Sequence, residues 1–534
     1  MVIDWTKWAS PEDDGPSAFV NDVNPRHRAV YRTDPRLIEV DRNIVAMISQ
    51  GDYRHRQIFE LIQNAADAIV EDISLKSGGR VKIVLTQEGL YCANEGAPFS
   101  HEGIESLRYP IATTKVGNQV GRYGHGFRSV LAVTSEPKIF SKTGSFEFKF
   151  QNVVDYLSEP LDDGRRNIDP SLLGTFEDQK VSVFVVPKPV NPKSAAEGDP
   201  ILSDLMEWAT TVIFLPFVSG RYYTDLPPFE HLRNELENFS AEFLIFTHHV
   251  SRLDFEIHDV EQISSHGFTC SNKTIRDIQI EPVNQAKKFG KNQLTRRICT
   301  ISKVGDPNNV EWIVFSDSQV DISSVGDLGV QQNRRRDAYG NYYPVPVTWA
   351  VKASLPSLGR GEFWFHFPTK DWTSLAGIIN APWDTTTERT KVLENQYNMF
   401  LVERVSHLVH QAIPHLLEFT SGDYGKIFDV VPARAAEAEG IAKILATTVP
   451  ELANSYASIP NLDGILTSST ELRQFPPKVI ERANDVADKW VQTWSEAPSA
   501  PRDFPHWTCL SSVNRKARLS NWLTPEASLR SKND

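Results

Sequence analysis

Cysteine is scarce in this sequence, with four residues in 534: Cys92, Cys270, Cys299 and Cys509. None of them belongs to a Cys-x-x-Cys pair, so their spacing argues against a zinc site and against a disulfide framework. A chain without disulfides suits a reducing compartment. The sequence therefore predicts a cytoplasmic protein.

Long apolar runs are also missing. The longest candidates, VIFLPFV at 212–218 and EFLIF at 242–246, are far shorter than the roughly 20 residues that cross a bilayer as a helix. The first residues, MVIDWTKWASPEDDG, contain no apolar core of a signal peptide. These absences predict that no membrane is a partner.

Positive charge is in deficit, because the formal net charge is −12. A protein that binds nucleic acid mainly through its charge needs a basic face. The basic run Arg334–Arg336 could contact nucleic acid or an acidic partner, but a solvated loop is the simpler interpretation. The negative net charge is compatible with nucleic acid as a partner but does not favour it.

The order of patterns in the first 220 residues predicts an α+β fold. A helical pattern over 54–73 precedes two alternating strands within 80–96, a helix at 101–112, a Gly-rich loop at 113–126 and a helix at 127–135. Strand patterns follow in EPKIFSK, SFEFKF and KVSVFVVP, residues 187–200 have the composition of a loop, and DLMEWATTVIFLPF has a helical pattern. This alternation predicts helices on one face of a mainly antiparallel sheet.

The rest of the chain divides by pattern into a strand-rich part and a helical part. Strand patterns predominate through 249–320 and 345–385, a strong amphipathic helix spans 397–419, and helical patterns return from about residue 425.

One predicted helix carries an unusual polar face. In ELIQNAADA, 60–68, Glu60, Asn64 and Asp67 fall within an arc of roughly 60° at the helical period. Apolar residues, among them Ile62 and Ala65, occupy the opposite side. The face is either an ordinary solvated surface or the floor of a ligand site.

Two glycine-containing segments follow that helix. In YCANEGAPFS, a strand delivers Asn94 to a turn at Gly96, where the backbone can approach a flat ligand. In TTKVGNQVGRYGHGF, a GxxGxG loop precedes a helix, and its amide groups suit phosphate oxygens. The loop is neither a P-loop, since GK[ST] is absent, nor a Rossmann fingerprint, since no strand precedes it.

Taken in this order, ELIQNAADA, ANEGAPF and GRYGHGFRSVLAVTSEPKIFS resemble the GHKL (Bergerat-fold) ATPase superfamily, and within it the sacsin-like and heat-shock protein 90-like branch. The motifs cover about residues 55–150, and a looser similarity extends to about residue 420. The resemblance implies an N-terminal Bergerat-type α/β sandwich ATPase domain at 1–225, an α/β middle domain at 226–420 and a mainly helical C-terminal region at 421–534.

The resemblance also implies roles for the polar face of the helix. Glu60 would be the general base that orients and deprotonates the attacking water. Asn64 would bind Mg²⁺ through its amide oxygen, and the cation would bridge the ATP phosphates. Asp67 would support the nucleotide pocket.

Other motif residues would surround the nucleotide. Gly96 would lie beneath the adenine, and Asn94 would face its amino group. The segment TTKVGNQV would close as a lid over ATP. The remaining residues implied to bind the cofactor are Thr114, Lys115, Gly121, Gly124, Gly126 and Phe127.

The chain departs from the family in two places. Asn94 stands where the family usually has Asp; it keeps an acceptor oxygen and adds a donor, so adenine binding is expected to survive. The family often carries a Gly-Thr pair before a late strand, and DQKVSV, 178–183, has none. Either the matching pair lies elsewhere in the chain or the contacts with adenine are thinner.

A later segment resembles the part of the middle domain in which an arginine reaches the γ-phosphate. In GIINAPWDTTTERTKVLENQYN, 377–398, Arg389 is the matching position. Its guanidinium can hold phosphate oxygens through two parallel hydrogen bonds. The alternative is a surface arginine in a loop.

The resemblance thus implies a Mg²⁺-dependent ATPase in which ATP drives lid and domain closure and acts, chaperone-like, on a protein client. A homodimer is compatible with this resemblance. Two alternatives stay open: a nucleic-acid-linked GHKL ATPase of the MutL or MORC type, in defence or DNA processing, and a nucleotide sensor that does not hydrolyse ATP.

Overall fold

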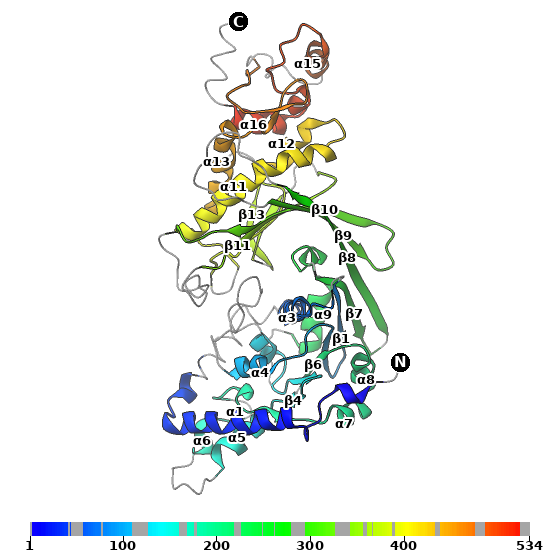
Figure 1. The fold of residues 1–534 in the computed structure, drawn as a ribbon, viewed down its shortest axis with the longest axis vertical. Coiled ribbons are helices and arrows are strands. Elements are labelled where there is room, and N and C mark those ends of the chain that lie inside the picture. Colours follow the sequence, from blue (N-terminus) through cyan, green and yellow to red (C-terminus); the bar gives the residue numbers. More distant parts are fainter. Residues whose placement is uncertain are drawn as a thin grey trace. The chain divides into compact units, whose positions relative to one another are not determined.

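The computed structural model describes residues 3–40, 43, 57–75, 78–108, 127–159, 168–175, 179–217, 226–247, 249–260, 262–278, 294–325, 342–355, 360–365, 367–386, 390–432, 438–475 and 486–523. Unit 1 comprises Met1–Ser271 and Ile301–Asn309, and unit 2 comprises Asn272–Thr300 and Val310–Asp534. Both units combine helices with sheet, so the predicted α+β class is confirmed (Figure 1). The predicted domain boundaries near residues 225 and 420 stay predictions.

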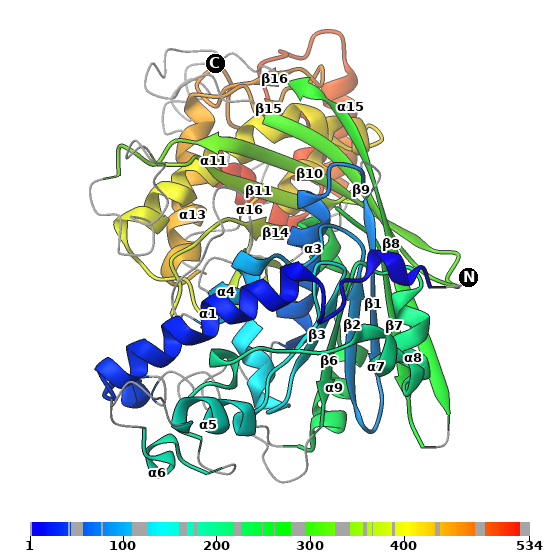
Figure 2. The same cartoon turned by 60° about the horizontal axis from the view of Figure 1, so that its bottom comes forward.

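Unit 1 contains a mixed sheet. Its strands are β1 (Gly79–Leu85), β2 (Gly89–Asn94), β3 (Lys138–Ser141), β4 (Phe146–Glu147), β5 (Lys188–Pro189), β6 (Thr211–Pro216), β7 (Val250–His258) and the first part of β8 (Ile263–Ile278). They lie in the order β8-β7-β1-β2-β6-β3-β4-β5, and Figure 2 shows β1, β2, β6 and β3 side by side. Strand β1 pairs parallel with β7 and antiparallel with β2, and β6 pairs antiparallel with both β2 and β3.

The helical elements of unit 1 surround this sheet. The α-helices are α1 (Asp14–Thr33), α3 (Gln57–Glu71), α4 (His101–Arg108), α5 (Phe150–Ser158), α6 (Pro170–Leu173), α7 (Pro192–Glu197), α8 (Pro200–Met206) and α9 (Pro228–Glu237). The 3-10 helices are η1 (Trp5–Lys7), η3 (Phe127–Ala132), η4 (Val183–Val185) and η5 (Ala241–Ile245).

Helices cover both faces of the sheet in unit 1, so the prediction of helices on one face is wrong. One face packs on α7 and α8 through Val84, Tyr91, Ala93, Phe140 and Val212. The opposite face meets α3 and α9, where Phe59 stacks on Phe239 and Phe239 meets Phe255 of β7 edge-on. Because side chains alternate along a strand, the two sets belong to opposite faces.

Three local predictions in unit 1 are wrong. Residues 187–200, predicted as a loop, contain α7, which starts at Pro192 after the N-cap Asn191. KVSVFVVP, predicted as a strand, forms η4. DLMEWATTVIFLPF, predicted as one helix, divides into α8 and β6. The apolar run after Thr211 is rich in β-branched residues, which pack well on a pleated surface.

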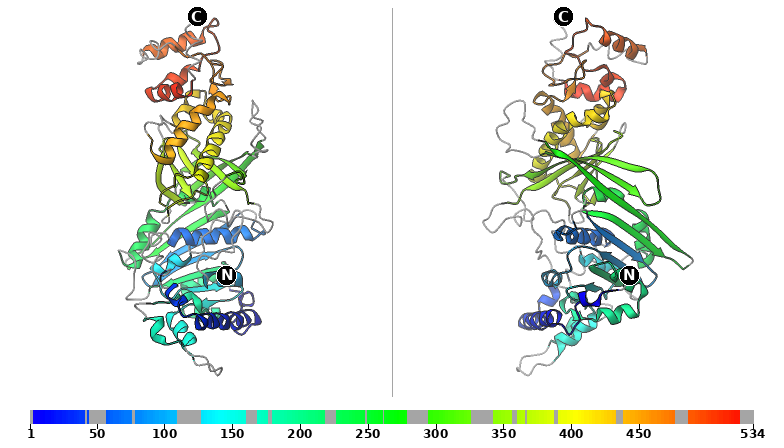
Figure 3. Two further views of the ribbon diagram at one scale, coloured as in Figure 1. Left: turned by 90° about the vertical axis from the view of Figure 1, so that its left-hand side faces the viewer. Right: turned by 45° about the vertical axis from the view of Figure 1, so that its right-hand side comes forward.

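Unit 2 combines a second group of strands with helices, as the sequence predicts for most of this region. Its strands are the rest of β8, the first part of β9 (Leu294–Lys303), nearly all of β10 (Asn309–Val320), β11 (Val345–Lys352), β12 (Gly361–Phe365), β13 (Phe367–Thr373), β14 (Gly377–Asn380), β15 (Ile459–Pro460) and β16 (Leu466–Thr467). Its helical elements are α11 (Gln396–Leu416), η6 (Leu417–Phe419), η7 (Tyr424–Lys426), α12 (Ile427–Val430), α13 (Gly440–Glu451), η9 (Leu452–Asn454), α15 (Val486–Glu496), η10 (Trp507–Leu510) and α16 (Val513–Trp522). Helix α11 confirms the amphipathic helix predicted at 397–419, and Figure 3 shows α11 in yellow among these elements.

Two histidines, the buried His410 and the half-buried His407, join α11 to the C-terminal part of unit 2. His410 Nε2 lies 2.6 Å from the Val449 carbonyl oxygen and its Nδ1 lies 3.0 Å from Ser458 Oγ, while His407 Nδ1 lies 2.7 Å from the Tyr456 hydroxyl. Burial lowers the pKa of both histidines to about 4, with the Arg404 charge adding to the shift at His407. The neutral imidazoles are therefore part of the packed structure.

We expect unit 2 to lose stability in mild acid. In the unfolded chain these histidines bind protons below pH 6.5, whereas in the folded protein they stay neutral down to about pH 4. Their contribution to the free energy of unfolding is therefore fully present above pH 6.5 and is lost as the pH falls from 6.5 to about 4. Between pH 7.5 and 5.5 the loss should be roughly 1 kcal/mol per histidine. Urea unfolding at both pH values measures it, and the double variant His407→Gln/His410→Gln should show a smaller difference. An equal difference in both proteins would contradict the assignment.

In the part of the chain that the structure describes, every helix is too short or too polar to span a bilayer. All four cysteines are buried, and none of them forms a disulfide bond in the structure.

Candidate functional site

Helix α3 carries the predicted polar face into the interior of unit 1. Glu60 is 2% exposed and Asp67 is 5% exposed, whereas Asn64 between them is half-buried. Glu60 lies in the first turn of the helix, where the helix dipole stabilises a carboxylate. A polar face that is largely buried differs from the solvated surface that an ordinary amphipathic helix presents.

The turn after β2 is joined to α3 through the backbone. Ala97 N donates to the Ala68 carbonyl oxygen at 2.8 Å. Gly96 has φ +116°, and a Cβ atom at this position would lie 2.6 Å from both the carbonyl carbon and oxygen of Ala68. Only glycine fits this close approach. The motifs ELIQNAADA and ANEG therefore meet in space.

A row of polar side chains lies at the end of the sheet on the face that meets α3. Asn94 ends β2, Thr211 begins β6 and Ser141 ends β3. Strand β6 lies between β2 and β3, and the register pairs Thr211 with Asn94 on one side and with Ser141 on the other. Asn94, Thr211 and Ser141, here called the polar row, are 4%, 3% and 0% exposed in that order. Asn94 therefore has two buried hydroxyl groups beside it on the same sheet face.

The polar row contains two residues that the sequence analysis did not select. The segment 179–183, where a Gly-Thr pair was sought, is not a strand, since Gln179 forms only an isolated bridge with Gly174 and η4 begins at Val183. The strand that lies beside Asn94 is β6, and Thr210–Thr211 stand at its start. The β-branched run TTVI favours a strand. Because the sequence analysis assigned this run to a helix, it did not identify Thr211 as a site residue.

Phe127 lies at the start of η3 and packs against Phe184, with ring centroids 5.7 Å apart. Two residues further on, the Ser129 carbonyl oxygen accepts a hydrogen bond from Gln57 Nε2 at 3.1 Å. Arg128 donates to the Leu107 carbonyl oxygen at the end of α4. The described residues on both sides of the Gly-rich segment thus lie together, beside the first turn of α3.

Several predicted site residues lie outside the described residues: Thr114, Lys115, Gly121, Gly124, Gly126 and Arg389. The basic run Arg334–Arg336 lies outside them as well. Their predicted roles stay predictions.

Chain segments on either side of Arg389 are held by one buried side chain of unit 2. Asn398 Nδ2 lies 2.7 Å from the carbonyl oxygens of both Asp384 and Leu393, and Asn398 Oδ1 accepts from Asp384 N at 2.9 Å. Thr385 and Val392 form an isolated β-bridge inside these contacts. The described residues before and after Arg389 are therefore held close to each other by Asn398.

The described residues contain no group of three or more His, Cys, Asp and Glu side chains that could hold a metal ion. Asn64, with its amide on the polar face of α3, is a residue that could contribute one oxygen ligand. Mg²⁺ commonly takes one or two ligands from a protein and the rest from water and substrate phosphates, so a single amide is compatible with a nucleotide-bound magnesium ion.

No known family model matches the chain, and no curated protein matches it. Among solved structures, the chain is similar to one described as the crystal structure of the N-terminal domain of a DNA repair protein. The two are 8% identical, the match covers 70% of this chain and 98% of that chain, and the TM-score is 0.27. A likeness at this level supports no argument about fold or function.

Proposed function

We propose that unit 1 binds Mg²⁺–ATP and hydrolyses it in the manner of the GHKL ATPases. The observation that carries the proposal is the meeting of α3 with the end of the sheet. The buried carboxylates of Glu60 and Asp67 share one helix with Asn64, and the same helix contacts the turn at Gly96 beside the polar row.

The proposed chemistry follows from the positions of these groups. The polar row offers hydrogen-bonding groups to a base, and the α3 side chains lie on the neighbouring helix. Glu60, as a carboxylate, would orient the attacking water and accept its proton. Bound Mg²⁺ would neutralise charge that develops on the phosphates, and Asn64 would hold it from the protein side. Asp67, which is buried near Gly96, would support the wall of the pocket.

The proposal extends beyond the site in the way that the family resemblance implies. The Gly-rich segment 113–126 would contact the phosphates, and Arg389 would reach the γ-phosphate. ATP binding would drive closure that acts on a protein client.

The test is nucleotide binding by the full chain with and without Mg²⁺. Calorimetric titration with ATP should show binding that weakens when EDTA removes the metal. Asn64→Ala should weaken Mg²⁺–ATP binding by about tenfold, because a contact to a charged group contributes roughly 1.5 kcal/mol or more. It should leave the much weaker metal-free binding unchanged. No ATP binding by the wild-type chain at millimolar concentration would refute the proposal.

A further inference from the structure

A buried glutamine joins the start of α3 to the described residues that follow the Gly-rich segment. Gln57 is the first residue of α3 and is 0% exposed. Its Nε2 donates to the Ser129 carbonyl oxygen of η3 at 3.1 Å. The two residues are 72 positions apart in the sequence. This hydrogen bond therefore connects two segments that meet only through the fold.

The orientation of the Gln57 amide follows from its partners. A backbone carbonyl oxygen can only accept a hydrogen bond, so the amide group that faces Ser129 is the nitrogen. The amide oxygen is directed to α9, where it lies 3.4 Å from His231 Nε2. Because an amide oxygen also only accepts, the proton of this second hydrogen bond belongs to the imidazole. Gln57 thus bridges α9 and η3, and each end of its amide has a defined role.

Arg128, the residue before Ser129, anchors η3 on another side. It donates to the Leu107 carbonyl oxygen at the end of α4, and its Nη1 lies 3.3 Å from Ser182 Oγ. The described residues on the two sides of the Gly-rich segment are therefore joined to each other by Arg128. The Gln57 amide joins the same base to the helix that carries Glu60.

We infer that Gln57 is a positioning residue that sets the distance between the Glu60 carboxylate and the Gly-rich segment during ATP hydrolysis. Glu60 lies three residues after Gln57, or about 4.5 Å along the helix axis. Ser129 lies three residues after Gly126, the last glycine of that segment. The role requires no contact between Gln57 and the nucleotide. The inference rests on the proposed ATPase site.

Hydrolysis depends on this distance more than nucleotide binding does. The water that Glu60 activates has to attack the γ-phosphate in line, and a misplacement of about 1 Å can lower the rate roughly a hundredfold. ADP has no γ-phosphate and needs no attacking water. Loss of the Gln57 amide is therefore expected to lower turnover strongly and to change the affinity for ADP little.

The experiment compares Gln57→Met with the wild-type full chain. Methionine is unbranched and similar in length to glutamine, but it has no group that could donate to the Ser129 carbonyl oxygen. Phosphate release at saturating ATP should fall about a hundredfold. The affinity for ADP, measured by calorimetric titration with Mg²⁺ present, should stay within about threefold.

His231 provides a second variant for the case in which Gln57→Met does not fold. His231→Leu removes the donor to the Gln57 amide oxygen and should lower turnover about tenfold, because the amide keeps only its bond to Ser129. His231→Gln keeps an N–H donor and should retain turnover close to that of the wild-type protein. Equal turnover in the two His231 variants would overturn the inference.

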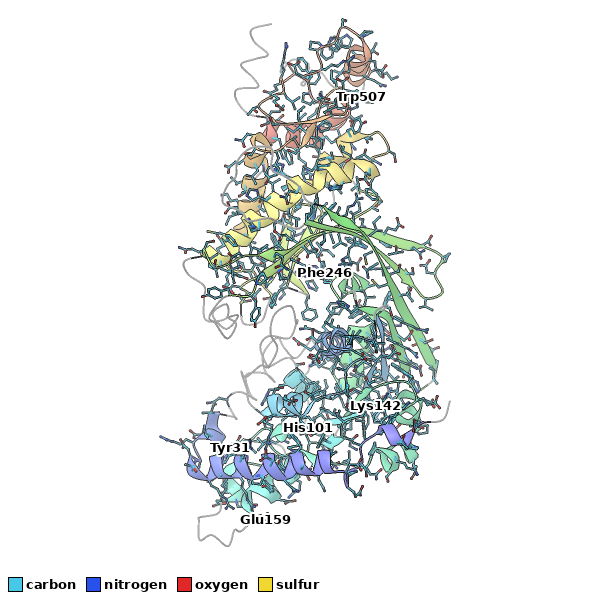
Figure 4. The ribbon with its side chains drawn as sticks, in the orientation of Figure 1. Tyr31, His101, Lys142, Glu159, Phe246 and Trp507 are labelled. Carbon is cyan, nitrogen blue, oxygen red and sulfur yellow. The ribbon has the colours of Figure 1, made fainter. Side chains whose placement is uncertain are left out.

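Thr247→Val is a matched control, because it also removes a buried side-chain hydrogen bond to a backbone carbonyl of unit 1. Thr247 is 3% exposed, and its Oγ1 donates to the Phe243 carbonyl oxygen at 3.1 Å, the same length as the bond from Gln57 to Ser129. It directly follows Phe246, which is labelled in Figure 4. Urea unfolding should show lower stability for Thr247→Val, whereas its turnover should be unchanged.

The remaining outcomes separate the inference from the proposed function. Unchanged turnover in Gln57→Met, or an equal loss of turnover in Thr247→Val, would overturn the inference and leave the proposed function standing. If turnover and ADP affinity of Gln57→Met fall by the same factor, Gln57 is only structural and the inference is again overturned. A wild-type chain that binds no nucleotide would overturn the proposed function and the inference together.

Discussion

Replacing Glu60 by glutamine is expected to stop ATP hydrolysis while leaving nucleotide binding intact. Glutamine has nearly the same shape but cannot accept the proton of the attacking water. A general base contributes roughly 10²–10⁴ in rate, so turnover should fall by that factor. Affinity for ADP should stay within about twofold, because the carboxylate acts on the water and not on the base. Phosphate release at saturating ATP measures the first effect, and titration with ADP measures the second.

Glu71 provides the matched control for this experiment. It lies on the same helix as Glu60 but is exposed at the helix end. Glu71→Gln removes the same charge from α3 and should retain wild-type turnover. Turnover that persists in Glu60→Gln would remove Glu60 from the role of base. If turnover and ADP affinity fall together, Glu60 instead supports the structure of the pocket.

Gly96→Ala is expected to destabilise unit 1 by at least about 3 kcal/mol, because it combines backbone strain with a steric clash. The φ of +116° is disfavoured for alanine, and the added Cβ atom would lie 2.6 Å from the carbonyl group of Ala68 in α3. The neighbouring atoms belong to helix backbone, which cannot rotate aside as a flexible side chain can. The helix or the turn must shift, which would also move the polar face away from the polar row.

Gly305→Ala is a control variant that measures the cost of backbone strain without a steric clash. Gly305 has φ +87°, and an added Cβ atom would meet nothing within 4 Å. Gly305→Ala should therefore cost only the strain, about 1 kcal/mol. Urea unfolding of the two variants, compared with the wild-type protein, gives both values. Equal destabilisation would show that the contact between Gly96 and α3 contributes little.

Sequence reasoning located the parts of the candidate site that depend on near neighbours in the chain. Helix α3 carries Glu60, Asn64 and Asp67 on one face because residues three and four apart share a face of any α-helix. Strands β1 and β2 were predicted because they alternate and meet at a short turn, and the structure pairs them as a hairpin. For the same local reason, Asn94 and Gly96 were placed at the strand end.

The polar row could not be predicted in this way. Ser141 and Thr211 are 70 residues apart in sequence, and both lie far from Asn94. Their approach depends on the order β2-β6-β3 and on a register in which a slip of one residue would turn each side chain to the other face. The error at 204–217 shows the same limit, because a short apolar run suits a buried helix or a buried strand equally well.

The sequence by itself therefore determined the polar face of α3 and the turn at Gly96, since both follow from periodicity and from the freedom of glycine at positive φ. The packing of this turn on the helix backbone and the two hydroxyl groups beside Asn94 became visible only in the folded chain. The physical reason is that strand pairing is a contact between distant segments. Its register is set by which sheet face the core buries, and no local pattern contains that information.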